Sequence, residues 1–313
     1  MVHNNNRQVF GLGETVFDVV FKNGKPIAGH PGGSTFNCMI SLGRCGINGA
    51  FISETGNDHI GDITIKLLED NDLSGEYVNR FSNGKSALSL AFLDEKNDAE
   101  YDYYKDYPNQ RLQLELPEIK KDDIVVFGSF IALNEAVRPF VKKFVEYAHS
   151  AGAIIYYDPN YRDKHVHKLE NLMPTLTENF KLSTIVRGSD EDFQNIYKTS
   201  SIEKVYNNIS EYCPNLIYTA NSKAVKVKTK NHELKHKVPN IQPISTVGAG
   251  DSFNAGIVYS LIKNNIGIDD IPGLQKESWD KMIQTAISFS TEVCMSYENY
   301  VSKGFAKKLL SKS

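Results

Sequence analysis

Residues 245–256 read STVGAGDSFNAG. The small residues Gly248, Ala249 and Gly250 precede a single carboxylate, Asp251, and the apolar residues that follow have helical spacing. Because these residues have little side-chain bulk, their backbone N–H groups can approach a ligand closely. The first N–H groups of a helix lack intrahelical partners and the positive end of the helix dipole lies there. The stretch therefore predicts an anion-binding helix terminus.

A carboxylate beside an anion site is unfavourable unless the chemistry uses it. In phosphoryl transfer from a nucleotide to an alcohol, positive dipoles stabilise the developing charge and an acceptor takes the hydroxyl proton. This chemistry makes Asp251 a candidate general base. The alternative is that Asp251 only caps the helix and the glycines only turn the chain, and an isolated Gly-x-Gly-Asp sequence leaves both interpretations open.

Other phosphate-binding motifs do not fit the sequence. The P-loop pattern G-x-x-x-x-G-K-[ST] does not occur. Phe253 stands where G-x-G-x-x-G has its third glycine, and residues 223–239 predict hairpins instead of a parallel strand. These differences disfavour a nicotinamide-dependent dehydrogenase.

The composition is that of a globular protein. The chain has 313 residues, of which 41% are hydrophobic and 23% charged, and its net charge is −3. Without a linker-like stretch, we expect one domain over residues 1–313. The charge disfavours nucleic acid and anionic membranes as partners. The polar start, MVHNNNRQ, and the absence of a long apolar run predict a cytoplasmic protein.

The four cysteines form no recognisable framework. They are Cys38, Cys45, Cys213 and Cys294, and no C-x-x-C occurs. We expect them to be small buried hydrophobic residues in a reducing compartment.

Short apolar runs alternate with helical patterns along most of the chain. The predicted strands are residues 9–13, 49–55, 123–129, 153–160, 183–189 and 216–221. Residues 135–152 predict an amphipathic helix, with Pro139 in its first turn and Gly152 after its end. Such alternation indicates a mostly parallel sheet covered by helices on both faces, with ligands beyond the carboxyl ends of the strands.

Two segments break this alternation. Residues 15–30 contain Asn23-Gly24 between apolar segments, a strong hairpin signal. Residues 87–106 predict two strands joined by a polar turn over residues 94–98. We expect a small sheet beside the main one, with segments at about 14–30 and 87–106, that acts as a lid. The alternative is a purely structural excursion.

Four stretches of the sequence resemble motifs of a known family. STVGAGDSFNAG is similar to the carboxyl-terminal signature of the PfkB, or ribokinase-like, carbohydrate kinases. PGGSTFNCMISLGRCG (31–46) resembles the amino-terminal signature, GETVFD (13–18) the start of fructokinase-like members, and DPNYR (158–162) their D-P-N-x-R stretch. The elements occur in the family's order from about residue 9 to 301.

The resemblance implies a three-layer α/β sandwich with a mostly parallel central sheet and a small β lid. It implies ATP-dependent phosphorylation of a sugar hydroxyl with Mg²⁺, and fructose is favoured. Asp251 corresponds to the base and residues 248–250 to the anion hole, while Asp18, Gly33 and Asn37 would face the sugar.

The chemistry of the sugar-side residues agrees with this correspondence. Ser34 is a candidate N-cap of the helix that carries Asn37, whose amide offers both a donor and an acceptor to a diol. Asp18 alternates with Phe17 and Val19 and should point to the opposite face of its strand. The alternatives are an exposed hairpin acid for Asp18, a capping side chain for Asn37 and a plain glycine turn at Gly33.

The nucleotide side departs from the family pattern. The family's N-x-x-E becomes Ser189-x-x-Asp192, and the shorter Asp192 is expected to reach the metal through a water unless it only starts a helix. The family's T-x-G becomes Thr219-Ala220-Asn221, which adds a side chain beside the expected nucleotide. Ser245 replaces an aspartate of the loop that binds a monovalent cation in relatives, so potassium dependence stays open.

Three residues outside these motifs are open. Tyr297 and Asn299, in the stretch 288–302, are candidate adenine contacts, although the end of a core helix explains them as well. His30 is a candidate sugar contact, with a surface loop role as the alternative.

The hypothesis is therefore an ATP-dependent sugar kinase with a small-molecule substrate. Alternatives are a kinase of another small alcohol (a nucleoside, ribose or a keto-sugar acid) and a non-catalytic sugar-binding relative. Ribokinase-like enzymes often pair through their lids, and by this analogy a homodimer is one option for the chain.

Overall fold

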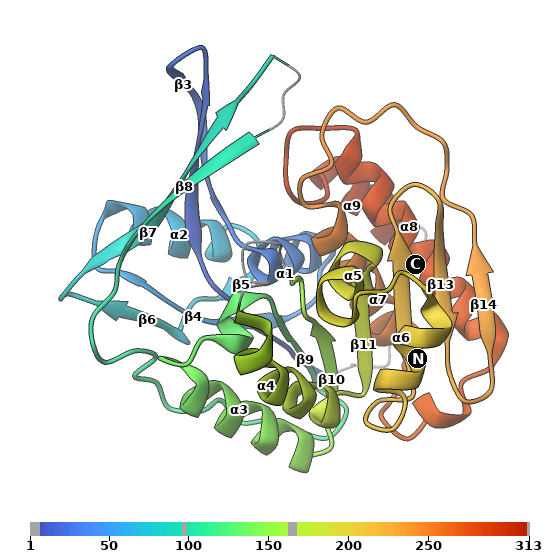
Figure 1. Cartoon of the computed structure of the whole chain (residues 1–313). Coiled ribbons are helices and arrows are strands. Elements are labelled where there is room, and N and C mark those ends of the chain that lie inside the picture. The colour runs from blue at the N-terminus through green and yellow to red at the C-terminus, as the bar shows by residue number, and fades with distance from the viewer. Residues whose placement is uncertain (1–6, 96–98, 162–167, 312–313) are drawn as a thin grey trace.

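The computed structural model describes residues 7–95, 99–161 and 168–311, and it contains two sheets (Figure 1). Arg162 of the DPNYR stretch and residues 96–98 of the predicted turn lie outside the described residues. The main sheet contains β1 (Val9–Leu12), β4 (Gly49–Gly56), β5 (Leu73–Ser74), β6 (Val78–Phe81), β9 (Ile124–Gly128), β10 (Ile154–Asp158), β11 (Ile185–Ser189), β12 (Leu216–Ala220), β13 (Ala224–Lys228) and β14 (Glu233–His236). The small sheet contains β2 (Val16–Lys22), β3 (Lys25–Gly32), β7 (Lys85–Leu93) and β8 (Ala99–Asp106).

The main sheet is mostly parallel, as the strand–helix alternation predicts. Its order is β14-β13-β12-β11-β10-β9-β1-β4-β5, and β6 pairs with β4. Among the strands that the structure describes, the antiparallel pairs of this sheet are β12–β13 and β13–β14, at one edge, which confirms the hairpins predicted for residues 223–239. The parallel strands therefore bring the residues that follow β1, β9, β10, β11 and β12 to one edge of the sheet.

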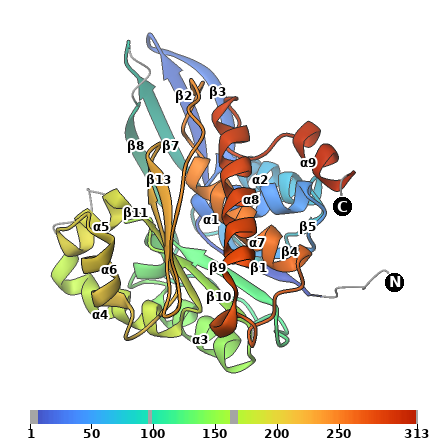
Figure 2. The same ribbon diagram turned by 90° about the vertical axis from the view of Figure 1, so that its right-hand side faces the viewer.

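Helices cover both faces of the main sheet and make three layers (Figure 2). The helices are α1 (Ser34–Arg44), α2 (His59–Glu69), α3 (Arg138–Ser150), α4 (Leu169–Leu182), α5 (Asp190–Tyr197), α6 (Ile202–Ile209), α7 (Ala249–Lys263), α8 (Lys276–Cys294) and α9 (Lys303–Leu310), with short 3₁₀ turns η1 (Phe130–Leu133) and η3 (Ile271–Gly273). Apolar residues of α1, α2, α7, α8 and α9 pack on one face. Those of α3, α4, α5 and α6 pack on the other.

Alternation along the central strand explains the two cores. Val9 of β1 belongs to the core beneath α1 and α7, whereas the next residue, Phe10, belongs to the core beneath α3 and α4. Both side chains are almost fully buried. A parallel strand with helices on each face must be apolar on both sides, which is why its sequence forms a continuous hydrophobic run.

The small sheet projects beyond the body of the molecule (Figure 1). β2 and β3 form the predicted hairpin, and Asn23 and Gly24 take positive φ angles of 52° and 72°, as a tight type I′ turn requires. β2 also pairs in parallel with β7, and β7 pairs antiparallel with β8. The register places Asp18 opposite Ser89 and Ser89 opposite Tyr103, so these three side chains share one face.

Two general expectations can be compared with the structure. All four cysteines are buried and unpaired, as predicted. Within residues 7–95, 99–161 and 168–311, no helix combines the length and the apolar character that a membrane crossing requires.

Candidate active site

The amino termini of α1 and α7 converge on the carboxylate of Asp251. Ser34 Oγ donates to Asp251 Oδ1 at 2.6 Å, and Asn37 Nδ2 donates to Asp251 Oδ2 at 2.9 Å. Both donors come from the first turn of α1, and Asp251 lies in the first turn of α7. Side chains separated by more than 200 residues in sequence are thus joined where the positive ends of two helix dipoles meet.

This geometry corrects two cap assignments. Gly33 is the N-cap of α1 and no side chain caps that helix, so the prediction of Ser34 as the cap is wrong. Ser34 is already the first helical residue, and its hydroxyl is committed to Asp251. The cap of α7 is Gly248, which also excludes the alternative in which Asp251 serves as the helix cap.

The turn of residues 248–250 requires glycine at 248 and has little free space at Gly250. Gly248 has a φ of 77°, and a Cβ built on it would lie 2.3 Å from the carbonyl oxygen of Asn299. A Cβ on Gly250 would lie 3.3 Å from a guanidinium nitrogen of Arg187. The turn is therefore pressed against the loop after α8 on one side and against a buried cation on the other.

Close backbone packing also positions Asp18 and Gly33. A Cβ on Gly32 would lie 2.4 Å from Asp18 Oδ2. Gly33 has a φ of 132°, and its Cβ would meet the carbonyl oxygen of Glu14 at 2.2 Å. Asp18 thus packs on the strand end that leads into α1, two residues before Ser34. The structure brings Asp18, Gly33, Asn37 and Asp251 into one contiguous group.

One buried polar atom of this group, Asn37 Oδ1, has no hydrogen-bond partner among the described residues. Leaving a buried polar atom unpaired costs about 1–3 kcal/mol, so Asn37 Oδ1 is a candidate acceptor for a ligand hydroxyl. Ser89 lies opposite Asp18 in the small sheet. Burial raises the pKa of Asp18 to about 6, although a side-chain hydrogen bond with Ser89 opposes part of this shift.

A buried ion pair that the sequence analysis missed lies beneath the turn of residues 248–250. Arg187 Nη1 contacts Asp158 Oδ2 at 2.8 Å, and Arg187 Nη2 donates to Thr219 Oγ1 at 2.8 Å. Asn254 of α7 donates to the same Asp158 oxygen at 2.7 Å. Asp158 ends β10, Thr219 lies one residue before the end of β12, and Arg187 is the middle residue of β11. Polar residues within or closing three successive apolar strands were the signal available in the sequence.

Ser189 and Asp192 form the capping box of α5. Asp192 Oδ2 accepts hydrogen bonds from Ser189 N at 2.7 Å and from Ser189 Oγ at 2.6 Å, and Asp192 Oδ1 accepts from Tyr161 N at 2.6 Å. Asp192 is only 4% exposed, and burial together with the nearby Asp158 carboxylate raises its pKa. Asn221 lies in the exposed turn between β12 and β13 with a φ of 45°.

Within the described ranges, no group of three or more His, Cys, Asp or Glu side chains is arranged to hold a metal ion. A magnesium ion that keeps most of its waters and also contacts substrate phosphates does not need such a group.

Sequence similarity extends over almost the whole chain. The sequence profile described as pfkB family carbohydrate kinase matches residues 8–295. The chain belongs to this family of carbohydrate kinases. Probable fructokinase-2 from Arabidopsis thaliana is 24% identical over 253 residues, which cover 79% of this chain and 77% of the relative. Fructokinase-2 from Solanum lycopersicum is 24% identical over 247 residues, which cover 77% and 75% of the two chains.

Solved structures share the fold of this carbohydrate kinase. The fructokinase from Vibrio cholerae O395, solved with fructose, ADP and a calcium ion, superposes with a TM-score of 0.84 at 20% identity, over 98% of this chain and 100% of the other. The aminoimidazole riboside kinase from Salmonella enterica, solved with its riboside and an ATP analogue, gives 0.82 at 18% identity over 97% and 98%. The fold class and the family that the motifs predicted are confirmed.

Two cations near the small sheet of this kinase, Lys105 and Arg111, are paired with carboxylates. Lys105 Nζ lies 3.5 Å from Glu14 Oε1 and 5.9 Å from the centre of the Phe130 ring, so it connects the small sheet to the body. Arg111 contacts Glu54, and its guanidinium stacks 3.7 Å from the centre of the Tyr107 ring. These two positive charges therefore each have a negative partner within the protein.

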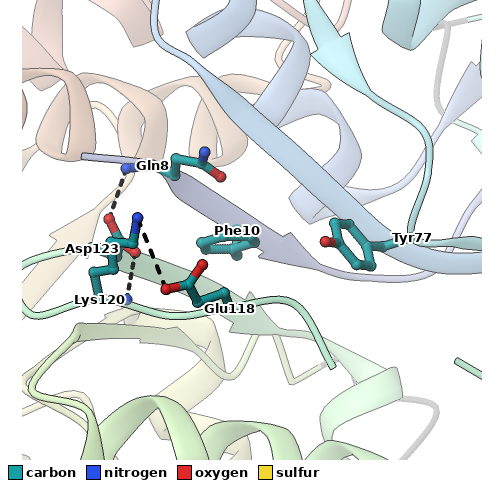
Figure 3. A pocket seen from close by; sticks show the side chains of 6 residues that line it. All are labelled: Gln8, Phe10, Tyr77, Glu118, Lys120 and Asp123. Carbon is teal, nitrogen blue, oxygen red and sulfur yellow. Dashed lines mark hydrogen bonds and ion pairs between the residues drawn. The ribbon is translucent and has the colours of Figure 1, made fainter. Parts of the chain in front are cut away.

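A separate cavity lies at the opposite end of β1 (Figure 3). It has a volume of about 190 Å³ and is lined by Gln8, Phe10, Tyr77, Glu118, Lys120 and Asp123. Asp123 accepts hydrogen bonds from the backbone N–H groups of Gln8 and Lys120, both at 2.8 Å. These residues precede or begin β1 and β9, so this cavity belongs to the amino end of the sheet and not to the site around Asp251.

Proposed function

We propose that the chain transfers the γ-phosphoryl group of ATP to a hydroxyl of a neutral sugar, with fructose preferred and Asp251 as general base. One observation carries the proposal. Asp251 is held by Ser34 and Asn37 at the meeting point of two helix amino termini, next to the glycine turn of residues 248–250 and to the unpartnered Asn37 Oδ1. Base, anion-binding N–H groups and sugar acceptor thus lie together.

The sugar would bind between the small sheet and α1. Asp18 and Asn37 Oδ1 would accept hydrogen bonds from sugar hydroxyls, and Gly33 would let the sugar approach the backbone. Asp251 would accept the proton of the reacting hydroxyl as the oxygen attacks phosphorus. The hydrogen bonds from Ser34 and Asn37 would fix the orientation of the carboxylate. The proton acceptor is then already placed for the reaction, which lowers the entropic cost of reaching the transition state.

The phosphates would bind at the turn of residues 248–250. Backbone N–H groups there would stabilise the charge that develops on the transferred group, and the buried Arg187 beneath Gly250 adds a fixed positive charge. Ser189, Thr219 and Asn221 border the proposed nucleotide side.

We propose that a magnesium ion would be held near this turn mainly by phosphates and waters, where it would neutralise charge on the phosphates. Both oxygens of Asp192 already have partners within the protein, so we propose that its contact with the ion runs through a water.

The paired cations favour a neutral sugar over a sugar acid. A keto-sugar acid needs a free cation for its carboxylate, and both Lys105 and Arg111 are neutralised by Glu14 and Glu54. The relatives named as fructokinases and the Vibrio cholerae structure with fructose support fructose as the preferred substrate. A neutral nucleoside is the second candidate, because the riboside kinase from Salmonella enterica has nearly the same TM-score.

We propose that the small sheet, with its segments at about 14–30 and 87–106, closes over the sugar as a lid. Closure would exclude water and so protect ATP from hydrolysis. Phe92 and Tyr104 lie on the face opposite Asp18 and are 39% and 57% exposed, which supports a homodimer formed through this face. Sedimentation of the purified protein measures its oligomeric state.

A coupled assay for ADP release tests the proposal. The purified protein is mixed with MgATP and, in turn, fructose, ribose, a nucleoside, a keto-sugar acid or no acceptor, each with sodium or potassium as the monovalent cation. We expect the highest kcat/KM with fructose and little ADP without an acceptor. Calorimetry with each sugar accompanies the assay. Sugar binding without ADP release would identify a non-catalytic sugar-binding protein and contradict the proposal.

A further inference from the structure

A single hydrogen bond joins the small sheet to the loop that supports the glycine turn. Asn299 Nδ2 lies 3.0 Å from His30 Nε2, between residues 269 positions apart in the chain. His30 belongs to β3, and Asn299 belongs to the loop after α8. The mechanism described above uses neither residue.

His30 lies beside the proposed sugar site. In the antiparallel pairing of β2 and β3, His30 is directly opposite Asp18, and Asp18 is opposite Ser89 on the other side. Residues directly opposite in neighbouring strands point to the same face, so His30, Asp18 and Ser89 form one polar row. A ligand that draws Asp18 towards it will therefore act on the backbone that carries His30.

Asn299 lies against the proposed phosphate site. Its carbonyl group is the neighbour that a Cβ on Gly248 would meet at 2.3 Å. Asn299 is only 4% exposed, in contrast to Tyr297 of the same loop, which is 80% exposed. Val301, two residues further along the same loop, is anchored on α1. Val301 N donates to Ser41 Oγ at 3.3 Å, and Arg44 Nη1 donates to Val301 O at 2.9 Å. The backbone of Asn299 therefore packs directly against Gly248, in a loop that is also anchored on α1.

The hydrogen bond fixes the protonation state of the histidine. An amide nitrogen only donates, so His30 Nε2 must accept, which requires a neutral ring with its proton on Nδ1. Burial lowers the pKa of His30, partly opposed by Glu298, and this favours the neutral ring. The buried Asn299 amide would otherwise lose its partner.

We propose that His30 and Asn299 are positioning residues that couple sugar binding at Asp18 to nucleotide binding at residues 248–250. Sugar bound beside Asp18 holds β3 in place, the His30–Asn299 bond holds the loop after α8, and the loop holds the glycine turn in its phosphate-binding conformation. By linkage, nucleotide raises the affinity for sugar by the same factor. The inference rests on the proposed sugar kinase function and adds the physical connection between its two substrates.

The test is a binding experiment that does not depend on turnover. Titration calorimetry measures the Kd of a non-hydrolysable ATP analogue with magnesium, in the absence of sugar and in saturating fructose. In the unmodified protein we expect fructose to lower this Kd by about fivefold, the size expected for one buried hydrogen bond and a modest coupling. In His30→Phe and Asn299→Ala the ratio should fall to nearly one, and the double variant should show no further loss.

His30→Gln is the matched control, because its side-chain oxygen still accepts a hydrogen bond and should retain most of the coupling. A merely structural role would lower the melting temperature or both affinities without changing the ratio. If Asn299→Ala fails to fold, His30→Phe on the half-buried strand still carries the test. An unchanged ratio in His30→Phe, or a ratio of one in the unmodified protein, would overturn the coupling.

The two proposals fail in different ways. If neither fructose nor the other neutral acceptors bind, the proposed function fails and the coupling falls with it. If the substrates bind and are turned over but the variants keep the fivefold ratio, only the coupling is wrong.

Discussion

The proposed sugar side and the proposed nucleotide side of the site differ in which buried polar groups lack a hydrogen-bond partner. On the sugar side, the acceptor Asn37 Oδ1 is buried without a partner among the residues that the structure describes. On the nucleotide side, Asp192 is bonded to Ser189 and Tyr161, and Thr219 is bonded to Arg187. Among the described residues, the nucleotide side instead leaves a buried donor unpaired, Arg187 Nε.

This difference suggests that the two sides bind their substrates through different kinds of groups. A site that leaves buried side-chain acceptors unpaired binds a hydroxylated ligand through those side chains and rejects analogues that lack the hydroxyls. On the proposed nucleotide side the carboxylate and hydroxyl oxygens are already paired, so we propose that the phosphates bind through the backbone N–H groups of residues 248–250. Changes of the surrounding side chains should then have weaker effects. Substitutions should therefore affect the reaction strongly on the sugar side and weakly on the nucleotide side.

The largest effect is expected at the boundary between the two sides. Asp251→Asn keeps the shape of the side chain but removes the proton acceptor, so kcat should fall by about 10³-fold, within the range of general-base catalysis. Steady-state kinetics and calorimetry measure the effect, and nucleotide should still bind. A kcat within tenfold of the unmodified enzyme would contradict the assignment of the base.

The second prediction tests whether Asn37 contacts the sugar or only orients Asp251. Asn37→Ala removes both the unpartnered acceptor and a donor to Asp251, so kcat/KM for fructose should fall by about 10²-fold, as losses of buried hydrogen bonds to a substrate do. Ser34→Ala is the matched control, because it removes only a donor to Asp251. An equal loss in both variants would mean that Asn37 serves only to orient Asp251.

The sequence predicted most of the fold because its signals are local. The apolar strands at 9–13, 49–55, 123–129, 153–160, 183–189 and 216–221 each form a strand within a few residues of the expected limits. The Asn23-Gly24 turn also follows from its own residues, since both adopt the positive φ that few others tolerate. Local backbone preference and burial decide these elements.

The site was only partly predictable because its contacts join distant segments. Motifs pointed to Asp251, Asn37 and Asp18, but no pattern shows that Ser34 bonds Asp251 in place of capping its own helix. The pairing of Arg187 with Asp158 likewise depends on strand order, which places β10 beside β11. Side-chain partners across a fold follow from tertiary packing, and a single sequence does not specify them.

A third prediction concerns the pH dependence of sugar binding. Burial raises the pKa of Asp18 from 3.8 to about 6, so the free enzyme loses the carboxylate as the pH falls below 6. If the carboxylate accepts sugar hydroxyls, KM for fructose should rise by about tenfold per pH unit below that value. The pH profile of kcat/KM measures this limb.

Asp18→Asn is the control for that profile, because it cannot ionise. Its affinity should be lower at neutral pH and independent of pH on the acid side. The same raised pKa contributes to the free energy of unfolding of the sugar-free enzyme. This contribution of Asp18 is fully present below pH 3.8 and is lost as the pH rises through about 6. If kcat/KM of Asp18→Asn still falls at acid pH as it does in the unmodified enzyme, another group titrates and the assignment to Asp18 is wrong.

The smallest effect is expected on the nucleotide side. Asp192→Asn should raise the magnesium concentration for half-maximal activity by less than about tenfold, the lower end for residues that hold a metal indirectly. Ser201→Ala, which removes the cap of α6, is the control for the loss of a helix cap. A rise well above tenfold would make Asp192 a direct ligand and remove the contrast between the two sides.

The most direct test is a crystal structure of the protein with fructose and a non-hydrolysable ATP analogue. We expect one sugar hydroxyl within hydrogen-bond distance of an Asp251 carboxylate oxygen, another on Asn37 Oδ1, and the terminal phosphate on the N–H groups of residues 248–250. A sugar bound away from Asp251, or phosphates bound away from the glycine turn, would contradict the account.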